Sequence, residues 1–190
     1  MPSSRDLTRR GLLLGLAAVP LAAQSSEIAS TDLFEAGSGG YHLYRIPGLI
    51  VTRRNTVITY AEARRNTGSD WDDIDLLVRR STDGGRTFET PWLVPHIPGA
   101  VRNPVALERN IGQPDWRTYN NPIAISARNG RVHFLFCVEY MRVFYARSDD
   151  DGRTYSAPVE ITAAIAKLRP HYLWTVVATG PGHGIELRHG

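Results

Sequence analysis

Apolar and polar residues alternate in short runs along most of this chain, and turn-forming residues separate the runs. Alternation with a period of two is typical of β-strands that bury one face. Four runs follow one another in the first half of the chain and four in the second. They predict strands over residues 46–52, 56–63, 74–80 and 92–94, then 122–127, 131–139, 143–147 and 158–160. We therefore expect an all-β chain built from two four-stranded units.

The remaining segments are less regular. Residues 97–119 contain several prolines and predict a long loop that could cover one face of the strand array. Residues 161–168 are the one stretch that could form a short helix. Residues 180–190 read as a turn, a short alternating strand and the start of another hairpin.

One phrase, S-x-D-x-G-R-T-aromatic, occurs twice, beginning at residues 81 and 148 and thus 67 residues apart. A carboxylate followed by glycine builds a turn, because it accepts bonds from backbone N–H groups and glycine tolerates positive φ. The aromatic residue is expected to pack back onto its strands. The defining positions are Ser81, Asp83, Gly85, Thr87 and Phe88, then Ser148, Asp150, Gly152, Thr154 and Tyr155. A repeat of this length indicates equivalent supersecondary units.

The phrase resembles the Asp box of sialidase and BNR-repeat propellers. In that family it lies on the turn between the third and fourth strands of a blade, away from the active site. The resemblance implies a six-bladed β-propeller in which residues 25–190 supply about two to three blades. Because propellers close with typically four to eight blades, we expect the chain to be a fragment or a truncated gene product.

Three further motifs precede the first box: R-I-P at 45–47, A-E-A-R at 61–64, and Asp70. In this order they resemble the N-terminal part of bacterial sialidases (neuraminidases), and the resemblance extends from about residue 41 to residue 190. It implies that Arg45 is the first of three arginines that bind the sialic-acid carboxylate, and that Asp70 is the acid/base. A guanidinium suits the first role because its planar fork pairs with a carboxylate through two bonds.

Two more positions carry over from the family. Arg64 matches an arginine that lines the sugar pocket near the 4-position. Asn121 stands where many relatives have aspartate, so a sugar-binding role is implied there with altered contacts.

The assignment of the acid leaves alternatives open. Asp72, Asp73 and Asp75 lie close by, although Asp75 falls within a strand pattern and the other two depart from the family spacing. An acid that donates a proton near neutral pH needs its charged form disfavoured, which the neighbouring Trp71 and a buried substrate could supply.

The resemblance implies a retaining exo-α-sialidase that acts on sialylated glycans without a metal or other cofactor. The family's tyrosine nucleophile, its glutamate partner and two arginines are expected beyond residue 190, so the 190-residue chain alone is expected to be inactive. One alternative is a non-catalytic BNR-repeat propeller that binds glycans or proteins. Another is a propeller glycosidase or lyase for a different acidic sugar. The combination of Arg45, Arg64 and Asp70 favours the enzyme over a binding propeller.

The N-terminus has the pattern of an export signal. Arg9 and Arg10 precede an uncharged apolar run over residues 12–23 that ends in small residues. We interpret residues 1–24 as a cleaved Tat-type signal, which implies a periplasmic or extracellular protein without stable membrane insertion after cleavage. A retained N-terminal membrane anchor is the alternative.

Charge and cysteine content narrow the function further. The formal net charge is +3, but Arg5, Arg9 and Arg10 against Asp6 account for +2 of it, so the mature chain is nearly neutral. Without a basic stripe, the sequence does not favour nucleic-acid binding. The single Cys137 cannot form an internal disulfide, and we expect it to be a buried apolar side chain rather than a metal ligand.

Overall fold

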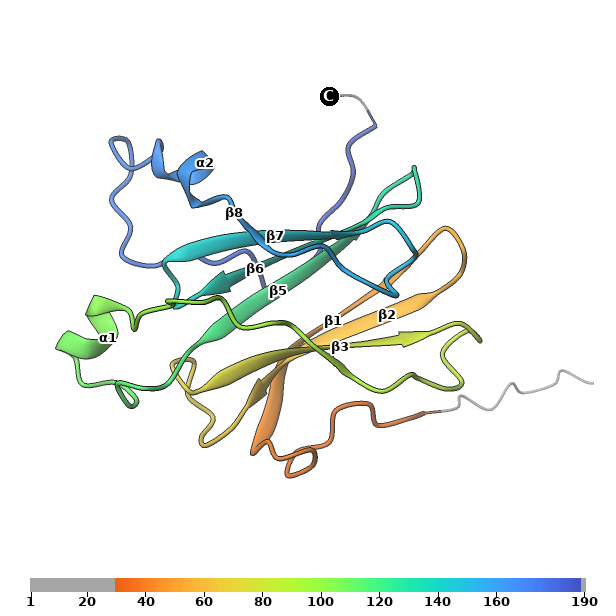
Figure 1. Ribbon diagram of the computed structural model, residues 1–190, viewed down its shortest axis with the longest axis horizontal. Helices are drawn as coiled ribbons and strands as arrows, with labels where there is room; N and C mark the ends of the chain where they lie inside the picture. The colour runs from red at the N-terminus through yellow and green to blue at the C-terminus, as the bar shows by residue number, and fades with distance from the viewer. Residues whose placement is uncertain (1–29, 189–190) are drawn as a thin grey trace, which may run out of the picture. The chain divides into compact units, whose positions relative to one another are not determined.

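The computed structural model describes residues 30–188, and its core is a pair of four-stranded antiparallel sheets (Figure 1). In each sheet the strands follow one another in sequence order, so each sheet is a simple meander. The first sheet comprises β1 (Leu43–Val51), β2 (Val57–Arg64), β3 (Ile74–Ser81) and β4 (Trp92–Leu93). The second comprises β5 (Tyr119–Ser126), β6 (Val132–Val138), β7 (Arg142–Ser148) and β8 (Val159–Glu160). The prediction of an all-β chain with two successive propeller blades is confirmed.

Three differences from the predicted elements stand out. Strand β1 begins three residues earlier than expected, which brings Arg45 into the strand. The loop over residues 97–119 contains a short helix, α1 (Pro104–Glu108), whose first turn is capped by the Asn103 side chain. The prediction of a strand after residue 180 is wrong, because residues 180–188 form no strand in the structure.

The short helix expected within residues 161–168 is present as α2 (Thr162–Ala166). No helix among residues 30–188 is both long enough and apolar enough to cross a membrane. The predicted export signal, residues 1–24, lies outside the described residues.

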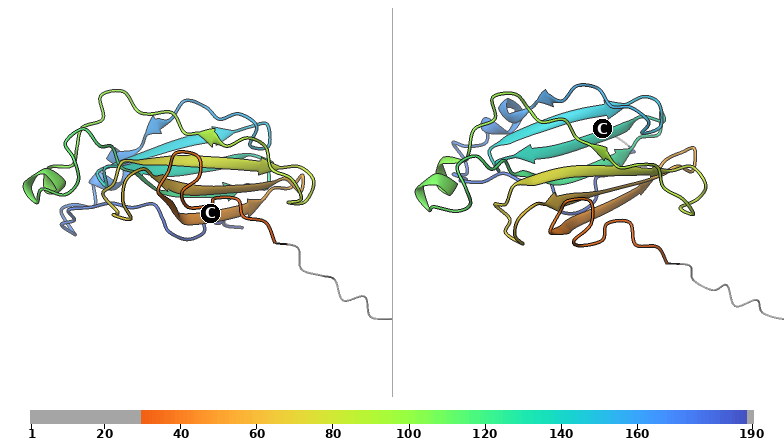
Figure 2. Two further views of the ribbon diagram at one scale, coloured as in Figure 1. Left: turned by 90° about the horizontal axis from the view of Figure 1, so that it is seen from below. Right: turned by 60° about the horizontal axis from the view of Figure 1, so that its bottom comes forward.

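Both sheets contribute to one apolar core. In the right-hand view of Figure 2 the second sheet lies above the first. Tyr60 of β2 meets Phe134 of β6 edge to face with ring centroids 5.8 Å apart, and the Tyr60 hydroxyl accepts the Ala124 N–H of β5 at 3.2 Å. Cys137 is fully buried, as expected. Burial of apolar side chains from both sheets is the main force that joins them.

The two copies of the repeated phrase form the same hydrogen-bonded turn. In the first, the Asp83 carboxylate accepts the Thr87 hydroxyl at 2.6 Å and the Ser81 hydroxyl at 2.7 Å. In the second, Asp150 accepts the corresponding bonds from Thr154 and Ser148 at 2.6 and 2.8 Å. These turns follow β3 and β7, between the third and fourth strand of each sheet.

The aromatic residues of the two copies differ in their surroundings. Tyr155 packs against the shared core and stacks on Trp92, with ring centroids 4.8 Å apart. Phe88 is half-buried beneath the guanidinium of Arg79. The second turn also joins the sheets, because its Asp151 carboxylate accepts the Thr56 hydroxyl.

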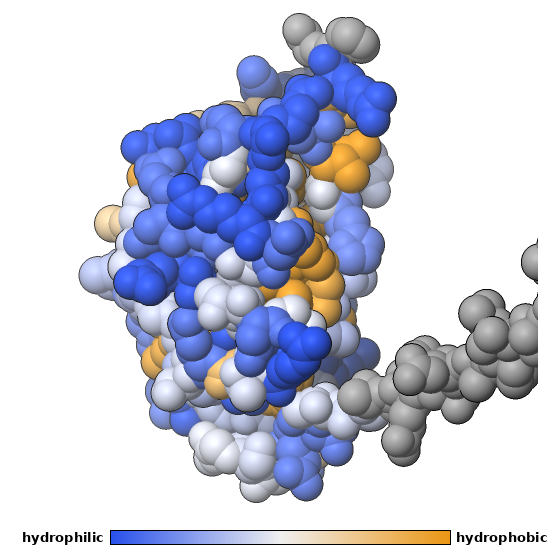
Figure 3. Space-filling model, turned by 90° about the vertical axis from the view of Figure 1, so that its right-hand side faces the viewer, coloured by the Kyte–Doolittle hydropathy of each residue, from blue (hydrophilic) through white to orange (hydrophobic). Residues whose placement is uncertain are grey.

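The two ends of the sheets carry different loops. Strand β3 runs from the loop over residues 65–73 at one end to the first Asp box at the other (Figure 1). Figure 3 looks onto the side of the molecule to which the Asp-box turns point, and it shows mainly hydrophilic residues there. The polar residues singled out upstream of the first box gather at the opposite end, around residues 65–73.

Candidate active site

Arg45 projects from an irregularity in β1. The pairing of β1 with β2 shifts register between Arg45 and Gly48, and the intervening Ile46 has a left-handed backbone with φ of 52°. Tyr60 lies so close over Gly48 that a Cβ there would be 2.2 Å from its ring. The Arg45 side chain is half-exposed, and its Nη1 is 3.1 Å from Asp70 Oδ1. The bulge thus directs a guanidinium from β1 toward the loop over residues 65–73.

Arg64, the last residue of β2, is the buried counterpart of Arg45. Its side chain is only 1% exposed, and its Nη2 donates to Asp70 Oδ1 at 2.8 Å and to Glu62 Oε2 at 2.6 Å. Its Nη1 donates to the Gly68 carbonyl at 2.6 Å. Because Glu62 and Arg64 are two residues apart on a strand, their side chains lie on the same face and pair directly.

Asp70 lies in the loop between β2 and β3, as the sequence predicts, and its side chain is 57% exposed. One oxygen, Oδ1, accepts hydrogen bonds from both Arg45 and Arg64. The structure therefore brings together three of the four residues expected in the site, with the Asp70 carboxylate between two guanidinium groups and open to solvent.

Two of the competing carboxylates, those of Asp72 and Asp73, stabilise the loop over residues 65–73. Asp72 is fully buried and accepts the backbone N–H groups of Asn66 and Thr67 at 3.1 and 2.5 Å. Asp73 accepts the backbone N–H of Arg117 at 3.1 Å. Both side chains are engaged in closing the loop and in tying it to the segment before β5.

The third competitor, Asp75, is buried within β3. Its carboxylate accepts the Tyr41 hydroxyl at 2.7 Å, lies 2.6 Å from His96 Nε2 and pairs with Arg65. Among the four aspartates in this part of the chain, only Asp70 presents most of its side chain to solvent.

Asn121 is the fourth expected site residue, and it is buried, as Arg64 is. It lies in β5, is 6% exposed and has φ of 52°. Its side-chain oxygen accepts the Asn120 side-chain amide at 2.6 Å, and its backbone N–H donates to Glu62 Oε1 at 2.8 Å. Asn121 is therefore linked to Arg64 through Glu62.

Glu62 was not assigned a role from the sequence, although its carboxylate links Arg64 to Asn121. Its two oxygens join Arg64 of β2 to the backbone of Asn121 in β5. Burial raises the pKa of Glu62, while the Asn121 N–H and the Arg64 guanidinium act in the opposite direction. The available signal was its place in the A-E-A-R motif, two residues before Arg64 on the same strand.

Two aromatic residues stand beside the charged groups. The rings of Trp71 and Tyr140 pack with centroids 4.8 Å apart. Burial, and after it the negative charges of Glu62 and Asp70, raise the pKa of Tyr140 to about 12. Tyr140 is thus a protonated phenol at neutral pH and can serve as a hydrogen-bond donor.

This arrangement can bind an anion and transfer a proton. Arg45 is accessible and carries a permanent positive charge, which suits it to a ligand carboxylate. Asp70 is the accessible carboxyl group next to it, so a bound anionic ligand would lie within reach of a proton donor and acceptor.

The chain resembles proteins called sialidases in both sequence and structure. It is 31% identical over 170 residues to a sialidase of Bacteroides fragilis, an alignment that covers 82% of this chain and 30% of that protein. It is 28% identical over 183 residues to an exo-alpha-sialidase of Aspergillus fumigatus, covering 88% of this chain and 44% of that protein. This chain thus spans less than half the length of either relative. No protein-family model matches it.

Solved structures of sialidases also resemble this chain. The Hadza microbial sialidase Hz136 superposes with a TM-score of 0.61 at 27% identity, covering 82% of this chain and 32% of that one. An intramolecular trans-sialidase from Ruminococcus gnavus, solved with oseltamivir carboxylate, superposes with a TM-score of 0.53 at 14% identity, over 66% of this chain and 50% of that one. The second likeness concerns the fold alone.

Proposed function

Because this chain belongs to the sialidase family, we propose that the full-length protein is a retaining exo-α-sialidase that releases terminal sialic acids from glycoconjugates. The observation that carries the proposal is the shared Asp70 oxygen, which accepts hydrogen bonds from Arg45 and Arg64 at an exposed end of the two sheets. This geometry combines an anion-binding group with a proton-transfer group, as hydrolysis of an acidic sugar requires.

In the proposed complex the substrate carboxylate pairs with Arg45. Arg45 then donates to the substrate instead of to Asp70, which leaves the exposed Asp70 carboxyl group available to the leaving oxygen. Arg64 is held by Glu62 and by the Gly68 carbonyl, so it keeps its position when the ligand binds. We assign Arg64 and Asn121 to the sugar pocket, with Asn121 acting at its buried side.

The chemical step needs a nucleophile in addition to these residues. We propose that a tyrosine outside this chain supplies it, assisted by a glutamate and by two further arginines that bind the substrate carboxylate. Tyr140 is unsuited to that role because its raised pKa of about 12 disfavours the phenolate. On this proposal the 190-residue chain by itself is inactive.

The proposed reaction has two balanced steps. The tyrosine hydroxyl gives its proton to the assisting glutamate and its oxygen bonds to the anomeric carbon, while the bond to the leaving oxygen breaks and Asp70 gives its proton to that oxygen. A water molecule then attacks the anomeric carbon and gives a proton to Asp70, and the tyrosine leaves and takes its proton back from the glutamate. Two inversions retain the configuration of the sugar.

Hydrolysis by the full-length protein tests this assignment against other acidic sugars. We expect it to cleave an aryl α-sialoside and to leave an aryl glucuronide intact, with the α anomer as the first product seen by NMR. Preferential cleavage of the glucuronide, or binding of sialosides without hydrolysis, would overturn it.

A matched pair of variants tests Arg45. We expect Arg45→Met to lower kcat/KM about 10- to 100-fold, because it removes charged hydrogen bonds to the substrate carboxylate. Arg54 lies in the hairpin at the other end of β1, and Arg54→Met should leave kcat/KM unchanged. Equal effects of the two substitutions would contradict the role of Arg45.

We also propose that the protein is exported through the twin-arginine signal of residues 1–24. Replacement of Arg9 and Arg10 by lysine should retain the precursor in the cytoplasm. N-terminal sequencing of the exported protein should find a start near residue 25, and a start at Met1 would contradict the proposal.

A further inference from the structure

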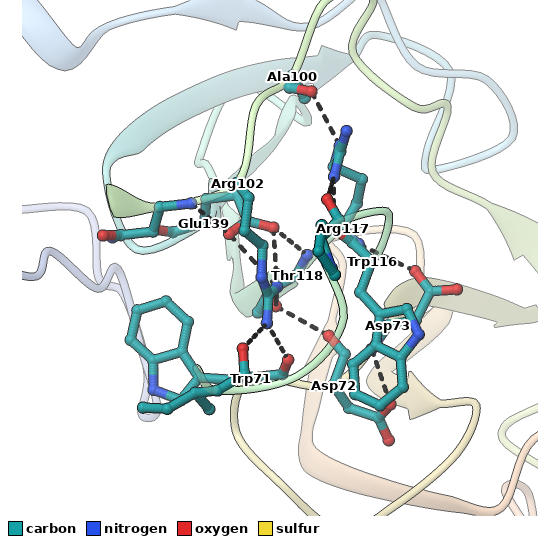
Figure 4. Close-up of polar contacts among 12 residues, drawn as sticks. Trp71, Asp72, Asp73, Ala100, Arg102, Trp116, Arg117, Thr118 and Glu139 are labelled. Atoms are coloured by element: carbon teal, nitrogen blue, oxygen red, sulfur yellow. Dashed lines mark hydrogen bonds and ion pairs between the residues drawn. The ribbon is translucent and has the colours of Figure 1, made fainter. Parts of the chain in front are cut away.

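Arg102 is a buried arginine that contacts the loop bearing Asp70, although it comes from the long connection between the sheets. Its Nη2 donates to the Trp71 carbonyl at 2.6 Å and to the Ile111 carbonyl at 3.0 Å (Figure 4). Its Nη1 donates to Thr118 Oγ1 at 2.9 Å and lies 3.2 Å from Glu139 Oε1. Arg102 thus links four segments, and one of its acceptors belongs to the residue directly after Asp70.

Glu139 holds Arg102 in place. Its side chain is 1% exposed, and besides Arg102 it accepts the backbone N–H of Asn103 at 2.9 Å and that of Thr118 at 2.7 Å. A buried ion pair carries a large desolvation cost, and this pair is compensated by neutral donors on both oxygens. The guanidinium position is therefore fixed from the second sheet.

A second set of bonds fixes the residues that follow Trp71. Thr118 Oγ1 donates to the Asp72 carbonyl at 2.8 Å, and the Ile74 N–H donates to the Arg117 carbonyl at 2.9 Å. The Arg117 N–H returns a bond to Asp73 Oδ1 at 3.1 Å. Each residue from 71 to 74 is thus bonded to Arg102 or to the segment that enters β5.

The Arg102 guanidinium is closely packed against Gly112. Gly112 has φ of 71°, and a Cβ at this position would lie 2.4 Å from Arg102 Nη2 and 2.9 Å from the Trp71 carbonyl oxygen. Only glycine allows the long connection to approach this contact so closely. The bond between Arg102 and Trp71 is therefore enclosed on the side of the connection as well.

These contacts reach Asp70 through the backbone. The polar partners of the Asp70 carboxylate within residues 30–188 are Arg45 and Arg64, both from the first sheet. Within residues 30–188 no hydrogen bond joins Arg102 or Glu139 to the carboxylate or to these two arginines, but Arg102 fixes the carbonyl of the next residue. A displacement of about 1 Å at a reacting group can cost about 100-fold in rate, so the position of this backbone matters for proton transfer.

We propose that Arg102, held by Glu139, is a positioning residue that sets the placement of Asp70 for proton transfer to the leaving group. This inference rests on the proposed sialidase function. It assigns to the connection between the sheets a part in catalysis that does not involve contact with the substrate.

The test compares two buried arginines that join the sheets at opposite ends. Lysine at position 102 cannot reach both carbonyls and Glu139 at once. Arg80 is the matched control, because its side chain is 10% exposed and its Nε donates to the Asp151 carbonyl at 2.9 Å, at the Asp-box end. Arg102→Lys and Arg80→Lys in the full-length protein should both lower stability, while only the first disturbs the loop of Asp70.

Two sialosides provide the readout. One carries a sugar leaving group, which needs a proton from Asp70, and the other carries an activated aryl leaving group, which does not. We expect Arg102→Lys to lower kcat for the sugar leaving group about 100-fold, with less than about threefold change in KM and in kcat for the aryl substrate. Arg80→Lys should change both substrates equally. Backbone amides of residues 66–73 should exchange with deuterium faster in Arg102→Lys than in Arg80→Lys.

The outcomes separate this inference from the proposed function. A wild-type protein that cleaves neither sialoside would overturn both. An active wild type in which the two lysine variants show the same ratio between substrates would overturn the positioning role alone. If Arg102→Lys does not fold, Thr118→Val replaces it, since it removes the bond to the Asp72 carbonyl with little change in volume. An unchanged substrate ratio in Thr118→Val would then count against the inference.

Discussion

Ile46 and Asn121 occupy equivalent positions in the two sheets and share a left-handed backbone, with φ of 52° at both residues. Each stands directly before a proline and within the register shift of the first strand pair of its sheet. The motif is thus the same bulge used twice. In the first sheet it directs Arg45 toward Asp70, and in the second it directs the Asn121 N–H toward Glu62.

The left-handed backbone at Ile46 predicts that this position tolerates replacement by a polar residue. A β-branched residue is strained at positive φ, whereas asparagine adopts this conformation readily. We expect Ile46→Asn to lower the free energy of unfolding by less than about 1 kcal/mol, because relief of strain offsets lost apolar burial. Ile50 packs against the core from the same strand, and Ile50→Asn should cost about 3 kcal/mol. Equal losses in urea denaturation would contradict the strain at Ile46.

Glu62 should contribute far more to stability than an exposed ion pair does. Glu62→Ala leaves the buried Arg64 without its partner, and we expect a loss of about 3 to 5 kcal/mol in the free energy of unfolding. The control is Glu160→Ala, which breaks the solvent-exposed pair with Arg142 and should cost less than about 1 kcal/mol. Urea denaturation measures both, and similar losses would show that Glu62 does not join the two sheets.

The second Asp box should make stability depend on acid pH. Although burial acts to raise the pKa of Asp150, the hydrogen bonds from Thr154 and Ser148 lower it to about 2, from an ordinary value of 3.8. The unfolded chain therefore takes up a proton at this residue first as the pH falls. Stability that Asp150 provides above about pH 4 is lost progressively as the pH falls toward 2.

Asp150→Asn should flatten this decline, as measured by the urea midpoint between pH 5 and pH 2. Asp115 is an exposed aspartate in the loop before β5, and Asp115→Asn serves as the control for the loss of one carboxylate outside the Asp boxes. Parallel curves for wild type and Asp150→Asn would refute the contribution of the Asp box.

Tyr140 provides a test of the proposal that the nucleophile is another tyrosine. Since its pKa is raised to about 12, we expect it to act at most as a hydrogen-bond donor. Tyr140→Phe should then keep kcat within about tenfold of the wild-type value. A loss of several thousandfold, together with loss of the covalent intermediate in mass spectrometry, would identify Tyr140 as the nucleophile and contradict our assignment.

The sequence predicts the sheets well because the strand signal is local. Alternation of apolar and polar residues and the two Asp boxes locate all eight strands, since both depend on residues close together in the chain. The segment after residue 180 shows the limit of this reasoning. It has an alternating pattern, yet a strand also needs a partner strand, and within the described residues none is paired with it.

The site was only partly predictable for a related reason. Arg45, Arg64 and Asp70 follow from motifs with fixed local spacing. Glu62 was not identified from the sequence because its role depends on a hydrogen bond to Asn121, 59 residues away in the chain. Arg102 and Glu139 form a buried pair 37 residues apart, and no pattern in the sequence indicates that they meet beneath the Asp70 loop. Long-range partners of buried charges are set by packing, which the sequence alone does not display.

The role of Asp70 can be measured most directly through its dependence on the leaving group. In the full-length protein we expect Asp70→Ala to lower kcat about 100- to 10,000-fold for a sialoside with a sugar leaving group, which requires general acid catalysis. Formation of the intermediate from an aryl sialoside with an activated leaving group should stay within about tenfold of wild type. Asp149→Ala, which removes an exposed aspartate at the Asp-box end, should not discriminate between the two substrates. Equal losses on both substrates in Asp70→Ala, or a selective loss in Asp149→Ala, would contradict the assignment of Asp70 as the proton donor.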